Sequence, residues 1–284
     1  MNNNGALLLS CPDRRGIAAY VSQFLYKHGA NIVHADEHKD DKLNLFFMRI
    51  EWSLDHFDLT SEKFHADFKP VAARFKMKWR YVLTQFRPKT AILVSNKDHC
   101  LMDLLYKYYR NELHCDIKLV VSNHLSAKKL TTFFNIPYYH IPTDGKNKKT
   151  SERKILSLLK KYEVDFIILA RYMQILSPEF VHCYPHGIIN IHHSFLPAFI
   201  GAKPYHQAYE RGVKIIGATS HYVTEDLDTG PIIEQDIIRV SHRDGVENLM
   251  SKGKDLERIV LSRAVQWHTE NRILIYGNKT VVFN

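Results

Sequence analysis

The sequence predicts an α/β protein with a ferredoxin-like domain at residues 1–86 and a doubly wound, mostly parallel α/β domain at residues 87–284. Three observations support this fold class. The chain has 284 residues, which is enough for two ordinary domains. Its first part alternates in the order strand, helix, strand, strand, helix, strand. Its second part alternates aliphatic strands with amphipathic helices, as parallel sheets covered on both faces do.

The elements of the first domain follow from the spacing of apolar residues. A strand is expected at 6–10, and Ile17, Val21, Phe24 and Leu25 then share one face of a helix. Gly29 is expected to end that helix through a left-handed cap. The remaining elements are expected to be strands at 31–38 and 45–52, joined by a charged turn, a helix at 64–75 and a strand at 77–84.

The stretches GALLLSCPDRRGIAAYVSQFLYKHGANIVHADEH and FFMRIEW resemble the ACT domain, and the turn PDRRG before the helix is the most specific part. The resemblance implies a regulatory module that binds an amino-acid effector near Asp13, Gly16 and Asn31. It also implies pairing with a second copy, so a homodimer or homotetramer is expected. A purely architectural role in oligomer assembly stays open as the alternative.

The second domain begins after the short linker Arg87-Pro88-Lys89. The expected strands and helices alternate: strands at 91–95, 117–122, 138–141, 165–170 and 188–192, and helices around 101–108, at 125–134 and at 151–162. A long amphipathic helix at 248–267 and a hairpin around 277–279 are expected to close the chain. In sheets of this kind the ligand crevice lies at the carboxyl ends of the strands.

A polar cluster stands at such a strand end, in the segment NIHHSFLPAF. Asn190 and His192 are two residues apart on a strand and therefore share a face, whereas His193 is expected to point the other way. The loop YVTEDLDTGP supplies carboxylates, among them Asp228, after the strand IIGATSHYV. An amide or a protonated imidazole can stabilise an oxyanion, and imidazoles and carboxylates move protons. From spacing alone, a core histidine and a turn aspartate remain equally open.

The motif N-I-H-x-S-x-L-P, followed by H-x-V and D-x-G-x-I-I segments, is similar to that of the folate-dependent formyltransferase fold. The stretches KDHCLMDLLY, VVSNH, ILARYMQILSP and RILIYGNKTVVF further resemble the 10-formyltetrahydrofolate deformylases, and the resemblance covers essentially the whole chain. It implies hydrolysis of 10-formyltetrahydrofolate to tetrahydrofolate and formate. That reaction would supply formate and balance one-carbon folate pools for purine synthesis.

The resemblance also implies the roles of individual residues. Asp228 would activate water, while Asn190 and His192 would stabilise the oxyanion. Two segments would bind the folate, the first with Met173, Gln174, Ile175 and Leu176 and the second with Val223, Glu225 and Asp226 in the pterin loop that ends at Asp228. Taken by themselves, residues 173–176 are more simply a helix start or apolar core.

No metal or other cofactor is expected. The sequence has no H-E-x-x-H pattern, and neighbouring strand residues such as His192 and His193 face opposite sides. The four cysteines are scattered, which predicts reduced thiols in the cytoplasm. No apolar run approaches the roughly 18 residues of a membrane span, and no signal peptide is expected.

The formal net charge of +9 favours anionic ligands. The basic residues are spread over the chain, so no nucleic-acid partner is expected. The densest run, Lys146 to Lys161, is either a solvated helix face or an attractor for a polyanionic substrate. Whether it contacts the glutamate tail of the folate stays open.

Two other functions are open at this point. A transferase acting on a phosphorylated ribonucleotide amine would need a glycine-rich anion cradle, but VSNKDHC and the residues up to Arg110 contain no glycine. Lys203-Pro204-Tyr205 is expected either to close over the site or to form a plain surface loop. Phe199, Lys203 and Tyr205 could fill the place of the amine and leave room for one water. A non-catalytic amino-acid sensor is the third reading, and intact Asn190, His192 and Asp228 argue against it.

Overall fold

The computed structural model describes residues 3–144, 147–198 and 204–283. The strands are β1 (Asn4–Pro12), β2 (Asn31–Asp40), β3 (Leu45–Ser53), β4 (Lys78–Leu83), β5 (Lys89–Val94), β6 (Asp116–Ser122), β7 (Tyr138–His140), β8 (Phe166–Leu169), β9 (Ile188–His192), β10 (Ile215–Tyr222), β11 (Ile232–Arg239), β12 (Ile273–Tyr276) and β13 (Lys279–Val282). The helices are α1 (Ile17–Lys27), α2 (Ser61–Phe75), α3 (His99–Tyr109), α4 (Lys128–Phe133), α5 (Lys148–Lys161), α6 (Pro178–His182), α7 (Pro204–Glu210) and α8 (Val246–Thr269). None of these helices is both long and apolar enough to span a bilayer.

The chain forms two compact units. The first contains Met1–Arg87, Glu270–Tyr276 and Thr280–Asn284, and the second contains Pro88–Thr269 and Gly277–Lys279. The sequence placed all of residues 87–284 in the second domain, whereas the two C-terminal segments group with the first unit. Their apolar side chains explain this grouping, because Val281 and Phe283 pack against Phe47 of β3.

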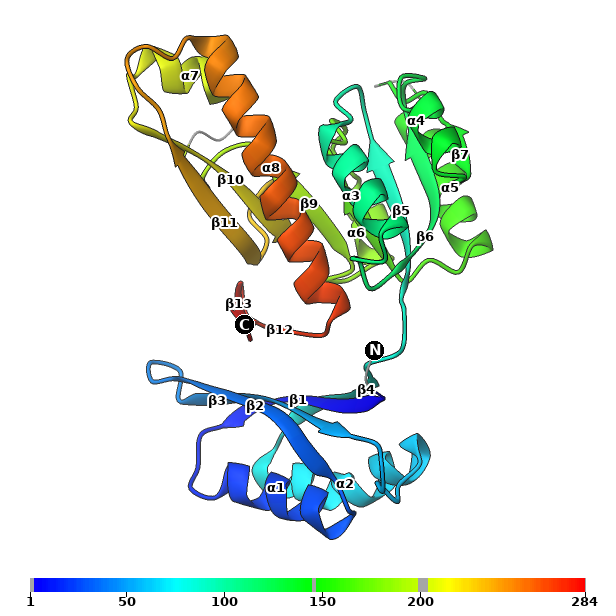
Figure 1. Ribbon diagram of the computed structural model, residues 1–284, viewed down its shortest axis with the longest axis vertical. Helices are drawn as coiled ribbons and strands as arrows, with labels where there is room; N and C mark the ends of the chain where they lie inside the picture. The colour runs from blue at the N-terminus through cyan, green and yellow to red at the C-terminus, as the bar shows by residue number, and fades with distance from the viewer. Residues whose placement is uncertain (1–2, 145–146, 199–203, 284) are drawn as a thin grey trace. The chain divides into compact units, whose positions relative to one another are not determined.

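The first unit is a four-stranded antiparallel sheet in the order β2-β3-β1-β4, with α1 and α2 on one face (Figure 1). The element order strand, helix, strand, strand, helix, strand is the predicted one. Gly29 follows α1 with a φ of 74°, which confirms the predicted left-handed cap. The expected strand at 6–10 extends to Asn4 and Pro12, because β1 pairs with β3 along its full length.

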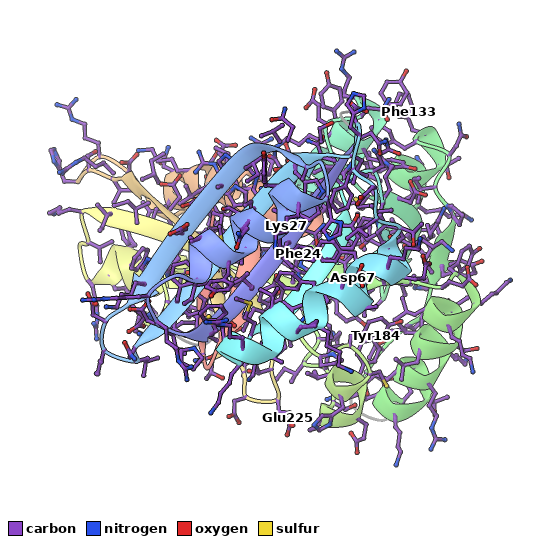
Figure 2. All side chains as sticks on the ribbon, turned by 90° about the horizontal axis from the view of Figure 1, so that it is seen from below. Phe24, Lys27, Asp67, Phe133, Tyr184 and Glu225 are labelled. Carbon is purple, nitrogen blue, oxygen red and sulfur yellow. The ribbon has the colours of Figure 1, made fainter. Side chains whose placement is uncertain are left out.

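Aromatic side chains fill the space between the helices and the sheet of the first unit. Figure 2 looks onto α1, which carries Phe24 and Lys27, and onto α2, which carries Asp67. Phe24 is buried and packs edge to face against Phe64 and Phe68 of α2, with ring centroids 5.5 and 5.2 Å apart. Such pairs add roughly 1 kcal/mol each beyond the area they bury. They hold the two helices together over a small sheet.

The second unit is a seven-stranded sheet in the order β11-β10-β9-β8-β5-β6-β7. The pairs from β9 through β8, β5 and β6 to β7 are parallel, and β10 is antiparallel to both β9 and β11. The mostly parallel α/β sheet predicted from the sequence is thereby confirmed. Helices α5 and α6 pack on one face, while α8 packs against β9, β10, β11 and α3.

Strand pairing brings three chain segments together in the second unit. Leu169 at the end of β8 pairs with Asn190 of β9 in parallel register. His221 of β10 pairs with the same Asn190 in antiparallel register. The IIGATSHYV strand therefore lies next to the strand bearing Asn190. The segments that follow β8, β9 and β10 therefore begin close to Asn190.

Candidate active site

A cavity of about 350 Å³ lies where these three segments meet. It is lined by residues 169 and 171–176 at and after the end of β8, 190–193 at the end of β9, and 221 and 223–228 at and after the end of β10. Every residue to which the sequence assigned a catalytic or folate-binding role lies on this wall. The structure thus brings together side chains that come from widely separated parts of the chain.

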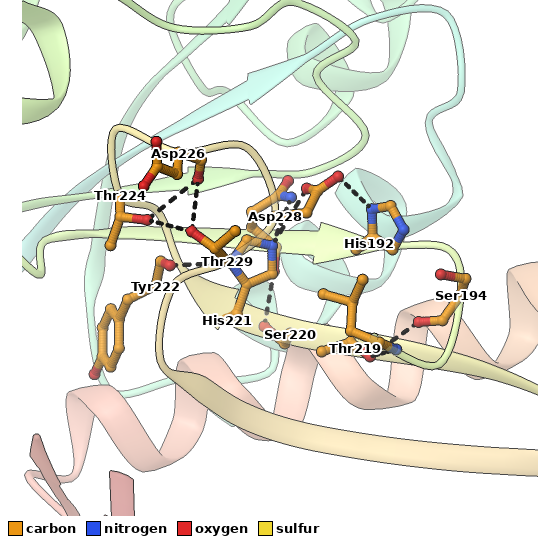
Figure 3. A network of polar contacts seen from close by, with 12 residues as sticks. His192, Ser194, Thr219, Ser220, His221, Tyr222, Thr224, Asp226, Asp228 and Thr229 are labelled. Atoms are coloured by element: carbon orange, nitrogen blue, oxygen red, sulfur yellow. Dashed lines mark hydrogen bonds and ion pairs between the residues drawn. The ribbon is translucent and has the colours of Figure 1, made fainter. Parts of the chain in front are cut away.

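His192 and Asp228 form the central pair of the cavity. His192 Nδ1 lies 3.2 Å from Asp228 Oδ2, and the two side chains are only 7% and 11% exposed (Figure 3). His221 Nε2 lies 3.6 Å from the other carboxylate oxygen, Oδ1. The Nε2 atom of His192 is buried and has no hydrogen-bond partner among the described residues. One imidazole nitrogen is therefore held by the carboxylate, and the other is left for a ligand.

The pKa of Asp228 lies well below its usual range. Burial alone would raise this pKa, but the hydrogen bonds with His192 and His221 outweigh burial and stabilise the carboxylate. Asp228 also has a φ of 56°, in the left-handed region that costs a non-glycine residue roughly 1 kcal/mol or more. An ionised carboxylate is thus held in a backbone conformation that its surroundings must enforce.

His221 is a site residue to which the sequence assigned no role. Its Nδ1 lies 3.0 Å from the carbonyl oxygen of Tyr222, which can only accept, so this nitrogen carries the hydrogen. Its Nε2 lies 3.2 Å from Nδ2 of Asn190 and 3.6 Å from Oδ1 of Asp228. His221 therefore orients the amide of Asn190. Its position in the H-x-V segment of the sequence motif is the feature that could have identified it as a site residue.

The loop that carries Asp228 is fixed by its own hydrogen bonds. The hydroxyl groups of Thr224 and Thr229 both donate to the carbonyl oxygen of Asp226, at 3.2 and 3.1 Å (Figure 3). A Cβ atom on Gly230 would lie 1.8 Å from the carbonyl oxygen of Tyr222. Only glycine fits where the loop returns to the sheet, and the turn Thr229-Gly230-Pro231 thereby sets the position of Asp228.

The two acidic neighbours of Asp228 are far more accessible. Glu225 is 54% exposed, forms an ion pair with His182 at 2.6 Å, and lies on an outer loop (Figure 2). Asp226 is exposed and engages the loop through its backbone carbonyl. Neither carboxylate touches His192, so Asp228 is the one that the geometry associates with the imidazole.

Residues 173–176 are neither a helix start nor a continuous piece of core. The segment has no regular structure, and α6 begins only at Pro178, where Ser177 caps it by accepting from the backbone N–H of Phe180 at 3.2 Å. Met173 and Ile175 are 57% and 61% exposed. Gln174 is half-buried, whereas Leu176 is buried in the core. Exposed apolar side chains at a cavity wall are typical of a binding surface.

His193 departs from the predicted alternation. Strand β9 ends at His192, so the next side chain is not constrained to the opposite face, and His193 also lines the cavity. Burial and then the charge of Arg171 lower the pKa of His193 to about 4. Arg171 lines the cavity too and was not identified from the sequence. It lies just past the carboxyl end of β8, where parallel sheets place their ligand sites, and this position could have identified it.

A possible metal-binding group among the described residues is His99, Cys100 and Glu257. Glu257 Oε2 already lies 2.7 Å from His99 Nε2 and 3.5 Å from Arg171 Nε, and a guanidinium competes with any cation there. Burial, followed by the charge of Glu257, raises the pKa of the Cys100 thiol well above its usual value. A protonated thiol is a poor metal ligand.

The structure describes only some of the residues expected to occupy the place of a second substrate, the amine that would accept the formyl group. Phe199 and Lys203 lie outside the described residues. Tyr205 belongs to α7 and is buried, and its hydroxyl donates to Glu257 Oε1 at 2.7 Å. Of the two alternatives for this segment, the plain surface loop is excluded at Tyr205, because helix α7 begins at Pro204.

The basic run at 146–161 forms α5, apart from Lys146, which lies outside the described residues. Ile155 and Leu159 are buried, while Arg153, Lys154 and Lys160 are exposed. The helix thus has a solvated basic face. None of its residues lines the cavity around His192.

The effector residues predicted from the sequence all lie in the first unit. The backbone N–H of Asp13 donates to the carbonyl oxygen of Asn44 at 2.9 Å, and its carboxylate pairs with Lys39 at 3.1 Å. Gly16 stands at the N-terminus of α1 with a φ of 91°. Asn31 begins β2 and is exposed.

Comparison with known proteins places this site in a family. Residues 88–265 match the model of the family described as formyl transferase. A formyltetrahydrofolate deformylase from Synechocystis is 50% identical over 282 residues, which is 99% of both chains. The Bacillus subtilis protein of the same name is 50% identical over 283 residues, which is 99% of this chain and 94% of its own.

Solved structures give the same result. A formyltetrahydrofolate deformylase from Pseudomonas syringae superposes with a TM-score of 0.97 at 47% identity, covering 100% of this chain and 95% of its own. A glycinamide ribonucleotide transformylase from Symbiobacterium toebii gives a TM-score of 0.66 at 27% identity, covering 70% of this chain and 95% of its own. The deformylase match extends over both units, and the transformylase match over a smaller part of the chain.

Proposed function

The chain belongs to the formyltetrahydrofolate deformylase family, and we propose that it hydrolyses 10-formyltetrahydrofolate to tetrahydrofolate and formate. The observation that carries this proposal is the contact of His192 with Asp228 in a cavity that Asn190 also lines. In this arrangement a carboxylate can bind and deprotonate water, and two nitrogen groups can donate hydrogen bonds to a developing oxyanion.

In the proposed reaction, the oxygen of a water molecule adds to the formyl carbon. The carboxylate of Asp228 orients the water and helps to take up its proton. The formyl oxygen becomes an oxyanion, to which a protonated His192 donates through Nε2 while Nδ1 donates to Asp228. Asn190 donates a second hydrogen bond to the oxyanion from its amide NH2 group. The carbon–nitrogen bond then breaks, and the folate nitrogen takes the proton that Asp228 received from the water, so that Asp228 is again a carboxylate.

We propose that the cavity walls on either side of this centre hold the folate. Met173, Gln174, Ile175 and Leu176 form one wall, and Val223, Glu225 and Asp226 form another. The exposed faces of Met173 and Ile175 offer apolar contact to a flat ring. Polar atoms of the 223–228 loop offer donors and acceptors to its edge.

We propose that the reaction needs no metal and no further cofactor. The formyl carbon is already electrophilic. Asp228, His192 and Asn190 together can supply the proton transfer and charge stabilisation that a metal would otherwise provide.

The hydrolysis itself is tested by incubating the protein with 10-formyltetrahydrofolate alone and following formate. Formate is expected to appear without any second substrate. Addition of glycinamide ribonucleotide carrying a free amine is expected neither to speed turnover nor to take up a labelled formyl group. Label on the ribonucleotide in place of free formate would show a transferase instead.

We propose that the first unit is an ACT domain that binds an amino-acid effector near Asp13, Gly16 and Asn31. Its element order and antiparallel sheet support this assignment. We further propose that the protein is a homodimer or homotetramer, because β2 is an edge strand with residues exposed along its length. Turnover measured with each amino acid in turn tests the effector.

We also propose a cytoplasmic protein that supplies formate and balances the one-carbon folate pools used in purine synthesis. Its four cysteines form no disulfide, which agrees with a reducing compartment. No nucleic-acid or membrane partner is proposed. Fractionation of cells that express the full chain tests the compartment.

A further inference from the structure

A second cavity, of about 200 Å³, adjoins the catalytic one in the second unit. Its lining includes Lys97, His99, Arg171, His193, Lys254 and Glu257, with Tyr205 and His206 as the other polar residues. Arg171 and His193 line both cavities, so they form the partition between them. We call this second cavity the cationic pocket.

The cationic pocket carries an excess of positive charge. Lys97 and Lys254 form no ion pair with any described residue, and Arg171 adds a third permanent cation. Glu257 is the one carboxylate among the described lining residues, and it is already engaged. Its Oε1 accepts from the hydroxyl of Tyr205 at 2.7 Å, and its Oε2 lies 3.5 Å from Arg171 Nε. The charge of Glu257 therefore leaves the two lysines uncompensated.

Arg171 has donors to spare at the partition. Its side chain is only 12% exposed; Nε lies 3.5 Å from Glu257 Oε2, and Nη1 is buried without a hydrogen-bond partner among the described residues. Leaving a buried charged donor unpaired costs free energy, so such groups usually meet an anion or water. Arg171 also has a φ of 63°, an unfavourable conformation for arginine that holds the side chain at this spot.

We propose that the cationic pocket binds a small oxyanion and receives the formate that hydrolysis produces. This inference rests on the proposed function. Formate would be formed beside the ionised carboxylate of Asp228, which repels it, while Arg171 in the partition and the two lysines beyond it attract it. A planar carboxylate also suits the paired donors of a guanidinium. Inorganic phosphate shares this chemistry and is the other anion that the pocket could take.

Binding is measured first without turnover, on the full-length protein with no folate present. Titration of ¹³C-formate, at ionic strength held constant with chloride, is followed by NMR line broadening. Lys254→Gln and Lys97→Gln are each expected to weaken formate binding about five- to tenfold, the effect of removing one nearby charge at intermediate dielectric. The matched control is Lys129→Gln, because Lys129 is exposed on α4 and lines neither cavity.

Three results would overturn the proposal: equal formate binding by all four proteins, no binding of formate, or binding of phosphate but not of formate. Product inhibition provides a separate readout. Formate is expected to inhibit hydrolysis, with an inhibition constant raised by the two pocket substitutions and not by Lys129→Gln. If formate binds as expected but no hydrolysis occurs, the proposed function fails while the anion pocket stands.

Discussion

The imidazole of His192 and the carboxylate of Asp228 belong to different segments of the chain and meet at 3.2 Å. Two features set this distance. The antiparallel register of β9 and β10 places His221 opposite Asn190, and the loop after β10 then returns over the end of β9. The catalytic pair is therefore a product of strand pairing and one tight turn.

Replacement of Asp228 by asparagine is expected to lower kcat about 100-fold or more, the range typical of removing a general base. The amide keeps the shape of the side chain but can neither hold a proton from water nor carry the charge. Binding of folate is expected to be largely retained. Steady-state kinetics would show the loss of kcat, and fluorescence titration with folate would show that binding is retained.

The matched controls are Asp226→Asn and Glu225→Gln in the same loop. Both are expected to change KM by only a few-fold, because neither carboxylate touches His192. Near-normal turnover of Asp228→Asn together with loss of kcat in either control would transfer the catalytic role to that neighbour.

Glu257→Gln is expected to destabilise the second unit by about 3 kcal/mol at neutral pH, as breaking a buried ion pair does. Burial raises the pKa of Glu257, but its hydrogen bond with His99 and the charge of Arg171 lower it overall. A lowered pKa contributes stability above the unfolded value of about 4.3, and this stability is lost as the pH falls. The difference from wild type should therefore shrink below about pH 4.

Urea unfolding between about pH 2.5 and pH 8 measures this dependence. Glu163→Gln is the control, because Glu163 pairs with Lys89 at the surface and is 77% exposed. Surface pairs contribute well under about 1 kcal/mol. A Glu257→Gln variant as stable as this control would mean that the buried network adds no net stability.

Gly230→Ala is expected to lower kcat by at least about tenfold while the fold is retained. The added Cβ would lie 1.8 Å from a backbone oxygen, so the loop that carries Asp228 must shift. Misplacement of a catalytic group by about 1 Å can cost 100-fold in rate. Gly245→Ala is the control, since its nearest neighbour would lie 3.7 Å away. Equal activity of the two variants would show that the loop position is not critical.

Periodicity predicted most of the fold, because both sheets are built from strands with strong apolar patterns. Strand β11 and the short helices α6 and α7 were not identified. Helices α6 and α7 have five and seven residues, too few to show a clear helical period. The grouping of residues 270–276 with the first unit depends on contacts distant in sequence, which a local pattern does not contain.

The motif also brought Asn190, His192 and Asp228 to attention, and the structure places all three on one cavity. Local spacing did not predict His221 or Arg171. The relation of His221 to Asn190 arises from antiparallel pairing, and spacing within one strand does not reveal its partner. The charge around Arg171 likewise depends on Lys254 and Glu257 of α8, far along the chain.

The last prediction concerns assembly through the first unit. Val33 is 51% exposed in the edge strand β2, whose outer backbone groups can pair with a second copy. A charge there would be buried in such an interface, so Val33→Asp is expected to shift a dimer toward monomer in light scattering. Leu43→Asp is the control, because Leu43 is 53% exposed in the turn after β2 and not in the strand. Hydrolysis should persist in both variants if the proposed site is complete within one chain. An unchanged oligomer in Val33→Asp would exclude β2 as the pairing edge.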